Sequence, residues 1–72
     1  MIIKTIGKIK FISPKGYGFI IASETKEEFF FHYTGLVDQN WRYSILPEDP
    51  VSFNVEKNDR GLIATNIEQI LT

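Results

Sequence analysis

Five short stretches of the chain have the composition or the alternation of β-strands. Val51, Phe53 and Val55 alternate strictly with polar residues, so their side chains would share one face of a strand. The apolar residues near the N-terminus show no helical period. The pattern predicts strands over residues 2–12, 17–22, 28–33, 51–55 and 62–70. The polar segments between successive strands, 13–16, 23–27 and 57–61, are typical of turns.

The segment between the third and fourth predicted strands, residues 34–49, has no clean period. Gly35 and Pro47 interrupt it, and Trp41 lies near its middle. A loop of this length is uncommon in a compact domain and is often functional. Five strands with short turns and one long loop predict an all-β fold for residues 1–72, taken as one domain. We expect a closed or nearly closed five-stranded antiparallel barrel, because closure removes unpaired edges.

Alternation divides the aromatic residues of the third strand between two faces. Phe29 and Phe31 share one face, and Phe30 and His32 share the other. We expect the first pair to point inward, together with apolar residues of the second and fourth strands: Ile20, Val51, Phe53 and Val55. The outward pair would then lie beside two rings of the second strand, Tyr17 and Phe19. A register slip of one residue would exchange the two faces.

The first strand does not alternate regularly. Ile9 and Phe11 have the same parity, so an unbroken strand would point both side chains to one face. Barrels need bends in order to close. We therefore expect a bulge or bend near Phe11.

The stretch Lys15–Ile20 combines two glycines, two rings and a cation. Tyr17 and Phe19 lie at a spacing of two and share a face, while Gly16 and Gly18 would let a partner approach the backbone closely. Exposed rings beside a cation are suited to stacking bases and holding a phosphate chain. The stretch therefore indicates a surface for single-stranded nucleic acid.

The distribution of charge adds to this picture. The net charge of −1 does not by itself favour a nucleic-acid binder. However, the first fifteen residues contain four lysines and no acid: Lys4, Lys8, Lys10 and Lys15. The acidic residues begin at Glu24. A polyanion would therefore meet the N-terminal strands, and stacking would supply much of the affinity.

The residue types present argue against several functional classes. The chain has no cysteine, and His32 is its one histidine, so a disulfide, a zinc site or a catalytic triad lacks the necessary residues. We expect no enzymatic activity, no metal, no cofactor and no small-molecule substrate. No apolar run is long enough to span a membrane. Lys4 and Lys8 interrupt the N-terminal apolar residues, whereas a signal peptide has a continuous apolar region. We expect a soluble, cytoplasmic monomer.

Two motifs in this sequence resemble those of the cold-shock domain family. Lys15–Ile20 resembles the first ribonucleoprotein motif of that domain, and Phe30–Tyr33 resembles the second. Gly7–Phe11 is similar to the opening strand, and Asn58–Gly61 with Ala64–Ile67 is similar to the ending. The resemblance covers nearly the whole chain. It implies a five-stranded OB-type barrel that binds single-stranded RNA and DNA with little sequence preference, and a role as an RNA chaperone and antiterminator, as in bacterial members.

The resemblance also implies which residues contact the ligand. Those that fall on ligand-contacting positions are Lys10, Phe11, Lys15, Tyr17, Phe19, Phe30, His32, Tyr33, Trp41 and Arg60. Lys8 joins Lys10 and Lys15 as an expected phosphate contact. Phe11 stands where the family usually has tryptophan, and should still stack with less area. Phe31 is larger than the usual valine, so the core must repack.

These residues also have purely structural interpretations. The rings could be barrel core, the lysines a solvated face, and Arg60 a turn residue. Trp41 could be a hydrophobic plug under the long loop instead of a stacking residue. The alternative function is an OB-fold protein-interaction module that uses the same aromatic face. The response to salt distinguishes the two, because a polyanion complex weakens as salt rises and an apolar contact does not.

Overall fold

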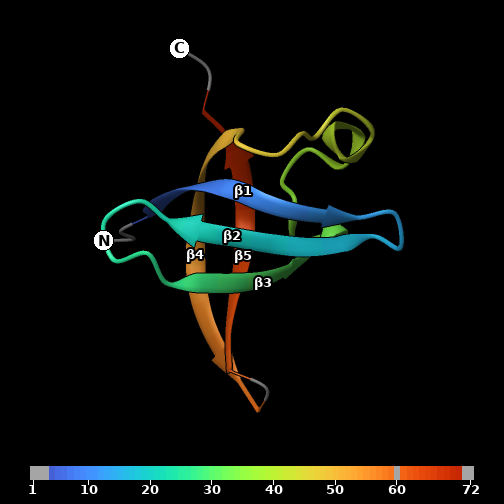
Figure 1. Cartoon of the computed structure of the whole chain (residues 1–72). Helices are drawn as coiled ribbons and strands as arrows, with labels where there is room; N and C mark the ends of the chain where they lie inside the picture. The colour runs from blue at the N-terminus through green and yellow to red at the C-terminus, as the bar shows by residue number, and fades with distance from the viewer. Residues whose placement is uncertain (1–3, 60, 71–72) are drawn as a thin grey trace.

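The computed structural model describes residues 4–59 and 61–70. In chain order, its elements are β1 (Thr5–Ser13), β2 (Tyr17–Ala22), β3 (Glu28–His32), the 3-10 helices η1 (Tyr33–Gly35) and η2 (Gln39–Tyr43), β4 (Pro50–Asn58) and β5 (Gly61–Gln69). The strands close into a barrel in the order β1-β2-β3-β5-β4 (Figure 1). The predicted five-stranded all-β barrel is therefore confirmed. In the described part of the chain, no helix is long and apolar enough to cross a membrane.

One seam of the barrel differs from the prediction. Neighbouring strands are antiparallel except for β3 and β5, which are parallel, with Phe30 opposite Ile63. A closed ring with an odd number of strands cannot alternate in direction all the way round, so at least one seam must be parallel. The expectation of a purely antiparallel barrel was wrong on this point.

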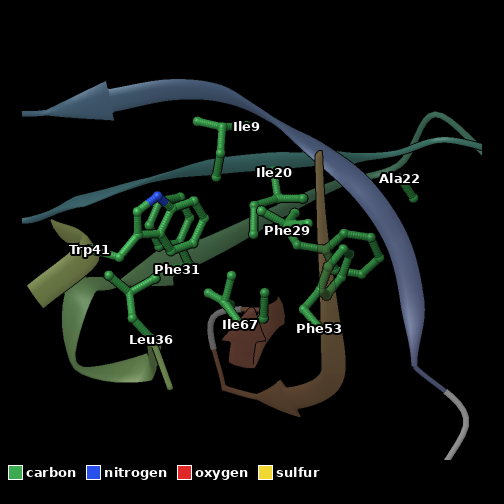
Figure 2. Close-up of a cluster of buried hydrophobic side chains, with 11 residues drawn as sticks. Ile9, Ile20, Ala22, Phe29, Phe31, Leu36, Trp41, Phe53 and Ile67 are labelled. Carbon is green, nitrogen blue, oxygen red and sulfur yellow. The ribbon is translucent and has the colours of Figure 1, made fainter. Parts of the chain in front are cut away.

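The core lies inside the barrel and contains the third-strand residues that alternation assigned to it. Phe29 and Phe31 are each 3% exposed, and the ring centroids of Phe29 and Phe53 are 5.3 Å apart. Figure 2 shows these rings converging with Ile20 of β2 on the barrel interior. Burying a side chain of this size contributes about 1.5–3 kcal/mol. The predicted faces of β3 are confirmed, and a register slip is excluded.

Val55 was expected in the core and is instead 43% exposed. The β1–β4 pairing reaches Phe53, which lies opposite Thr5, whereas the β4–β5 pairing continues to Asn58, opposite Gly61. The far end of the β4–β5 hairpin therefore projects beyond the barrel, as Figure 1 shows. Val55 has the parity of an inward residue but lies past the last β1–β4 pair of the described residues.

A β-bulge interrupts β1 where the sequence predicted a bend. Ile9 lies opposite Ile20 and Phe11 lies opposite Phe19, and the register shifts between these two pairs. Lys10 is therefore the extra residue. Because of this insertion, Ile9 is fully buried while Phe11 is 47% exposed, although the two have the same parity.

The connection between β3 and β4 is built from two short 3-10 helices, where the sequence indicated an irregular loop. The side-chain amide of Gln39 donates hydrogen bonds to the carbonyl oxygens of Tyr33 (3.0 Å) and Leu36 (2.7 Å). Leu36 is 4% exposed and forms a parallel bridge with Ile67 of β5. The connection is thus attached to the barrel by its own backbone and by a buried side chain.

Gly18 lies at a point of close approach between β1, β2 and the core. A Cβ atom at this position would lie 2.8 Å from Cε1 of Phe31 and would also collide with the backbone oxygen of Phe11. We therefore expect Gly18→Ala to lower the free energy of unfolding by about 1–3 kcal/mol, measured by urea denaturation. Gly35→Ala is the matched control, because its nearest neighbour would be the Ala64 oxygen at 3.4 Å. Equal stability of the two variants would contradict the prediction.

Candidate nucleic-acid interface

Four aromatic side chains form a continuous row on the outer face of β1, β2 and β3. Phe11 and Phe19 meet across the β1–β2 seam with centroids 6.3 Å apart. Phe19 and Phe30 meet across the β2–β3 seam at 5.8 Å, in an edge-to-face arrangement. Tyr17 stacks on Phe30 at 5.7 Å. We call Phe11, Tyr17, Phe19 and Phe30 the aromatic platform, and all four were predicted site residues.

The platform is accessible from solvent. Phe11 is 47% exposed and Phe30 is 39% exposed, while Tyr17 and Phe19 are half-buried. Single exposed apolar residues are common on protein surfaces, whereas a contiguous apolar patch often marks a binding site. Every nucleobase has a π-face, so a row of rings can accept bases with little regard to sequence.

His32 extends the platform along β3. It lies opposite Tyr17 in the β2–β3 register and is exposed. Its Nδ1 atom is 3.0 Å from Oγ1 of Thr34, and His32 is also the N-cap of η1. These contacts orient the imidazole beside the platform, where it can stack on a base or hydrogen-bond to one.

Tyr33 lies at the start of η1 and is half-buried. A Cβ atom on Gly16 would lie 2.8 Å from Cδ1 of Tyr33, so the ring packs closely on the β1–β2 turn. The guanidinium carbon of Arg42 lies 4.4 Å from the centroid of the Tyr33 ring. The centroids of the His32 and Tyr33 rings are 4.5 Å apart. Tyr33 was predicted as a ligand contact, and the structure places Arg42 over its ring.

Most of the predicted lysine contacts are ion-paired. Lys8 Nζ is 3.1 Å from Glu48 Oε2, and Lys10 Nζ is 2.8 Å from Glu28 Oε2. Both lysines are about half exposed, and exposed pairs of this type contribute only about 0–1 kcal/mol. A phosphate can therefore replace the carboxylate at small cost. Lys15 forms no ion pair with any carboxylate in the described ranges.

Trp41 lies in the core and not on the platform. It is 8% exposed and belongs to the same buried cluster as Phe31 and Leu36 (Figure 2). In this position its indole ring cannot stack on a ligand, so the structure matches the interpretation of Trp41 as a plug. The sequence spacing located the residue within the loop but could not indicate which side of η2 faces the barrel. Arg60, the last predicted contact, lies outside the described residues.

Comparison with known proteins identifies the family. The model of the 'Cold-shock' DNA-binding domain matches residues 5–70. The chain belongs to the cold-shock domain family. Cold shock-like protein CspG of Escherichia coli (strain K12) is 31% identical over 65 residues, which cover 89% of this chain and 91% of CspG. The family is one of nucleic-acid-binding domains, and the resemblance seen in the two motifs is confirmed.

Two further relatives are much longer than this chain. Y-box-binding protein 1 of Xenopus laevis is 34% identical over 68 residues, which cover 89% of this chain and 22% of that protein. Among solved structures, Drosophila Unr CSD456 superposes with a TM-score of 0.81 at 27% identity, covering 97% of this chain and 28% of that one. The chain therefore spans only 22% of the first and 28% of the second.

The two ribonucleoprotein motifs of this cold-shock domain lie on the adjacent antiparallel strands β2 and β3. The pairing places Phe19 beside Phe30 and Tyr17 beside His32 on one outer face. Phe11 joins them from β1 only because the bulge turns it outward. The fold thus assembles the platform from three strands, and each strand presents its rings by simple alternation or by one inserted residue.

The sequence analysis did not assign a role to Arg42, which lies beside Tyr43. The guanidinium carbon of Arg42 lies 4.7 Å from the Tyr43 centroid, and Nη2 donates a 2.7 Å hydrogen bond to the Tyr43 hydroxyl. This hydrogen bond raises the pKa of the Arg42 guanidinium above its ordinary value. The cation and one of the two rings that it contacts, Tyr43, are neighbours in sequence, whereas the other ring, Tyr33, lies nine residues before Arg42.

Proposed function

We propose that this cold-shock domain binds single-stranded RNA or DNA by stacking bases on the aromatic platform. The observation that carries the proposal is the unbroken row of ring contacts from Phe11 through Phe19 to Phe30 on one exposed face. Stacking contributes about 1–3 kcal/mol per base. Three or four stacked bases therefore outweigh the weak electrostatic effect of a net charge of −1.

Stacking of this kind favours unpaired strands. A base within a duplex already has both faces covered by its neighbours, so it cannot reach the platform without unstacking. A domain that captures unpaired bases shifts RNA away from secondary structure without consuming ATP. This reasoning supports a role as an RNA chaperone or antiterminator. Rings provide few hydrogen-bond donors and acceptors for reading base edges, so low sequence specificity is expected.

The test is fluorescence anisotropy of end-labelled oligo-dT and oligo-U, with a duplex of equal length as the comparison. We expect dissociation constants of about 1 μM or lower for the single strands, at least about tenfold weaker binding of the duplex, and affinity that falls as salt rises. The label must be on the oligonucleotide because Trp41 is buried and its fluorescence is not a direct reporter. Absence of single-strand binding at low salt would refute the proposal.

A protein-interaction module that uses the same face is the second candidate. Glutamate pairing of Lys8 and Lys10 favours it, because these pairs reduce the positive charge beside the platform. An apolar contact with a protein would persist or strengthen as salt rises. The salt titration therefore separates the two functions with one measurement.

A further inference from the structure

A hollow of about 400 Å³ adjoins the platform, between the β1–β2 turn and the loop that carries η2. Lys15 and Tyr17 line one side, Tyr33, Arg42 and Tyr43 line another, and the apolar residues Phe31 and Leu36 contribute from the core. Tyr17 belongs to both the platform and the hollow, so the two surfaces are continuous. The volume lies in the range of small-ligand sites and is sufficient for one nucleotide.

The charge of the hollow is unusual for this domain. Lys15 and Arg42 both line it, and no acidic residue of the described ranges does. Neither cation is ion-paired with a described carboxylate, whereas Lys4, Lys8 and Lys10 each pair with a glutamate. The hollow therefore brings together two cations that have no described carboxylate partner, with no described acidic residue in its lining.

Arg42 is held in place by aromatic contacts and not by a carboxylate. Its guanidinium carbon is 4.4 Å from the Tyr33 centroid and 4.7 Å from the Tyr43 centroid, and one hydrogen bond goes to the Tyr43 hydroxyl. Stacking leaves the charge uncompensated and the remaining N–H donors of the planar group available for oxygen acceptors. A guanidinium that is already positioned loses little conformational freedom when it binds a phosphate.

From this arrangement we propose that the hollow is a subsite for a backbone phosphodiester of the bound single strand, held between Lys15 and Arg42. The nucleotide is the neighbour, along the bound strand, of the one whose base stacks at Tyr17 on the platform. Tyr33 and Tyr43 act through Arg42, so both are positioning residues. This inference rests on the proposed function, and it adds a charged contact to a surface otherwise dominated by stacking.

The experiment is a scan of a short oligo-dT in which one linkage at a time is replaced by a neutral methylphosphonate. With the unchanged domain, one linkage should weaken binding about threefold more than the others. With Arg42→Gln or Lys15→Gln, this difference should shrink or vanish, and the slope of log affinity against log salt should fall by about 0.7. Arg42→Lys keeps the charge and should retain most of the slope.

Lys26→Gln is the matched control, because it removes the same charge at the exposed β2–β3 connection, at the far end of β2 from the hollow (Figure 1). It should leave the scan unchanged. If no linkage stands out, or if its effect persists in Arg42→Gln and Lys15→Gln, the hollow holds no phosphate. That result is distinct from failure of the proposed function, in which the unmodified strand does not bind or Phe30→Ala binds as well as the parent.

Discussion

Phe30→Ala is expected to weaken the binding of single-stranded oligonucleotides by about 10- to 100-fold. Phe30 contacts both Tyr17 and Phe19, so its removal eliminates one stacking surface and leaves two others without lateral support. The range corresponds to the loss of about 1–3 kcal/mol for one stacked base. Fluorescence anisotropy with labelled oligo-dT measures the change, and circular dichroism confirms that the barrel is folded.

The control for this loss is Val37→Ala. Val37 is 55% exposed and lies in the connection between η1 and η2, beside Trp41 and Ile67 and away from the platform. It removes exposed apolar surface of the same general kind, and its affinity should match that of the parent. If Phe30→Ala also binds like the parent, bases do not stack on the platform.

Trp41→Ala is expected to lower the free energy of unfolding by about 3–5 kcal/mol, because it removes a large side chain from the buried cluster. In a domain of 72 residues this is a large share of the total stability, so the variant should be mostly unfolded. Urea denaturation followed by far-ultraviolet circular dichroism is the appropriate measurement, since the variant has no tryptophan to report by fluorescence.

Trp41→Phe separates the core role from a ligand contact. The indole Nε1 is buried without a hydrogen-bond partner in the described structure, so phenylalanine removes an unsatisfied donor while it keeps most of the ring. We expect this variant to fold and to bind oligo-dT with the affinity of the parent. A folded Trp41→Phe domain with clearly weaker binding would show that the ring leaves the core to stack on the ligand.

The sequence predicted the platform well because alternation in a strand leaves few choices. Once Phe29 and Phe31 point inward, Phe30 and His32 must point outward, and the structure has this arrangement. The bulge was predictable for the same reason, since Ile9 and Phe11 cannot otherwise lie on opposite faces. Local periodicity was sufficient wherever the position of a side chain depended only on its own strand.

Features that depend on the closed barrel were not predictable from periodicity. Val55 has the correct parity for the core, but its exposure depends on how far β4 pairs with β1, and the described pairing ends at Phe53. Trp41 and Arg42 are neighbours on a short 3-10 helix, and the packing of that helix buries one and exposes the other. The contact between Arg42 and Tyr33 joins two segments of the loop, so no motif in either segment indicates it.

The parallel pairing of β3 with β5 connects ligand binding to the local opening of the barrel. Phe30 is the residue of β3 that lies opposite Ile63 of β5, and it is also in contact with two other platform rings. The seam joins segments that are far apart in sequence. Its formation therefore has a larger loop-closure entropy cost than the formation of a local hairpin. A single-stranded nucleic acid whose bases stack across β1, β2 and β3 adds contacts on the β3 side of this seam. Bound nucleic acid would therefore slow amide exchange at Ile63, a residue on a strand that contributes no ring to the platform.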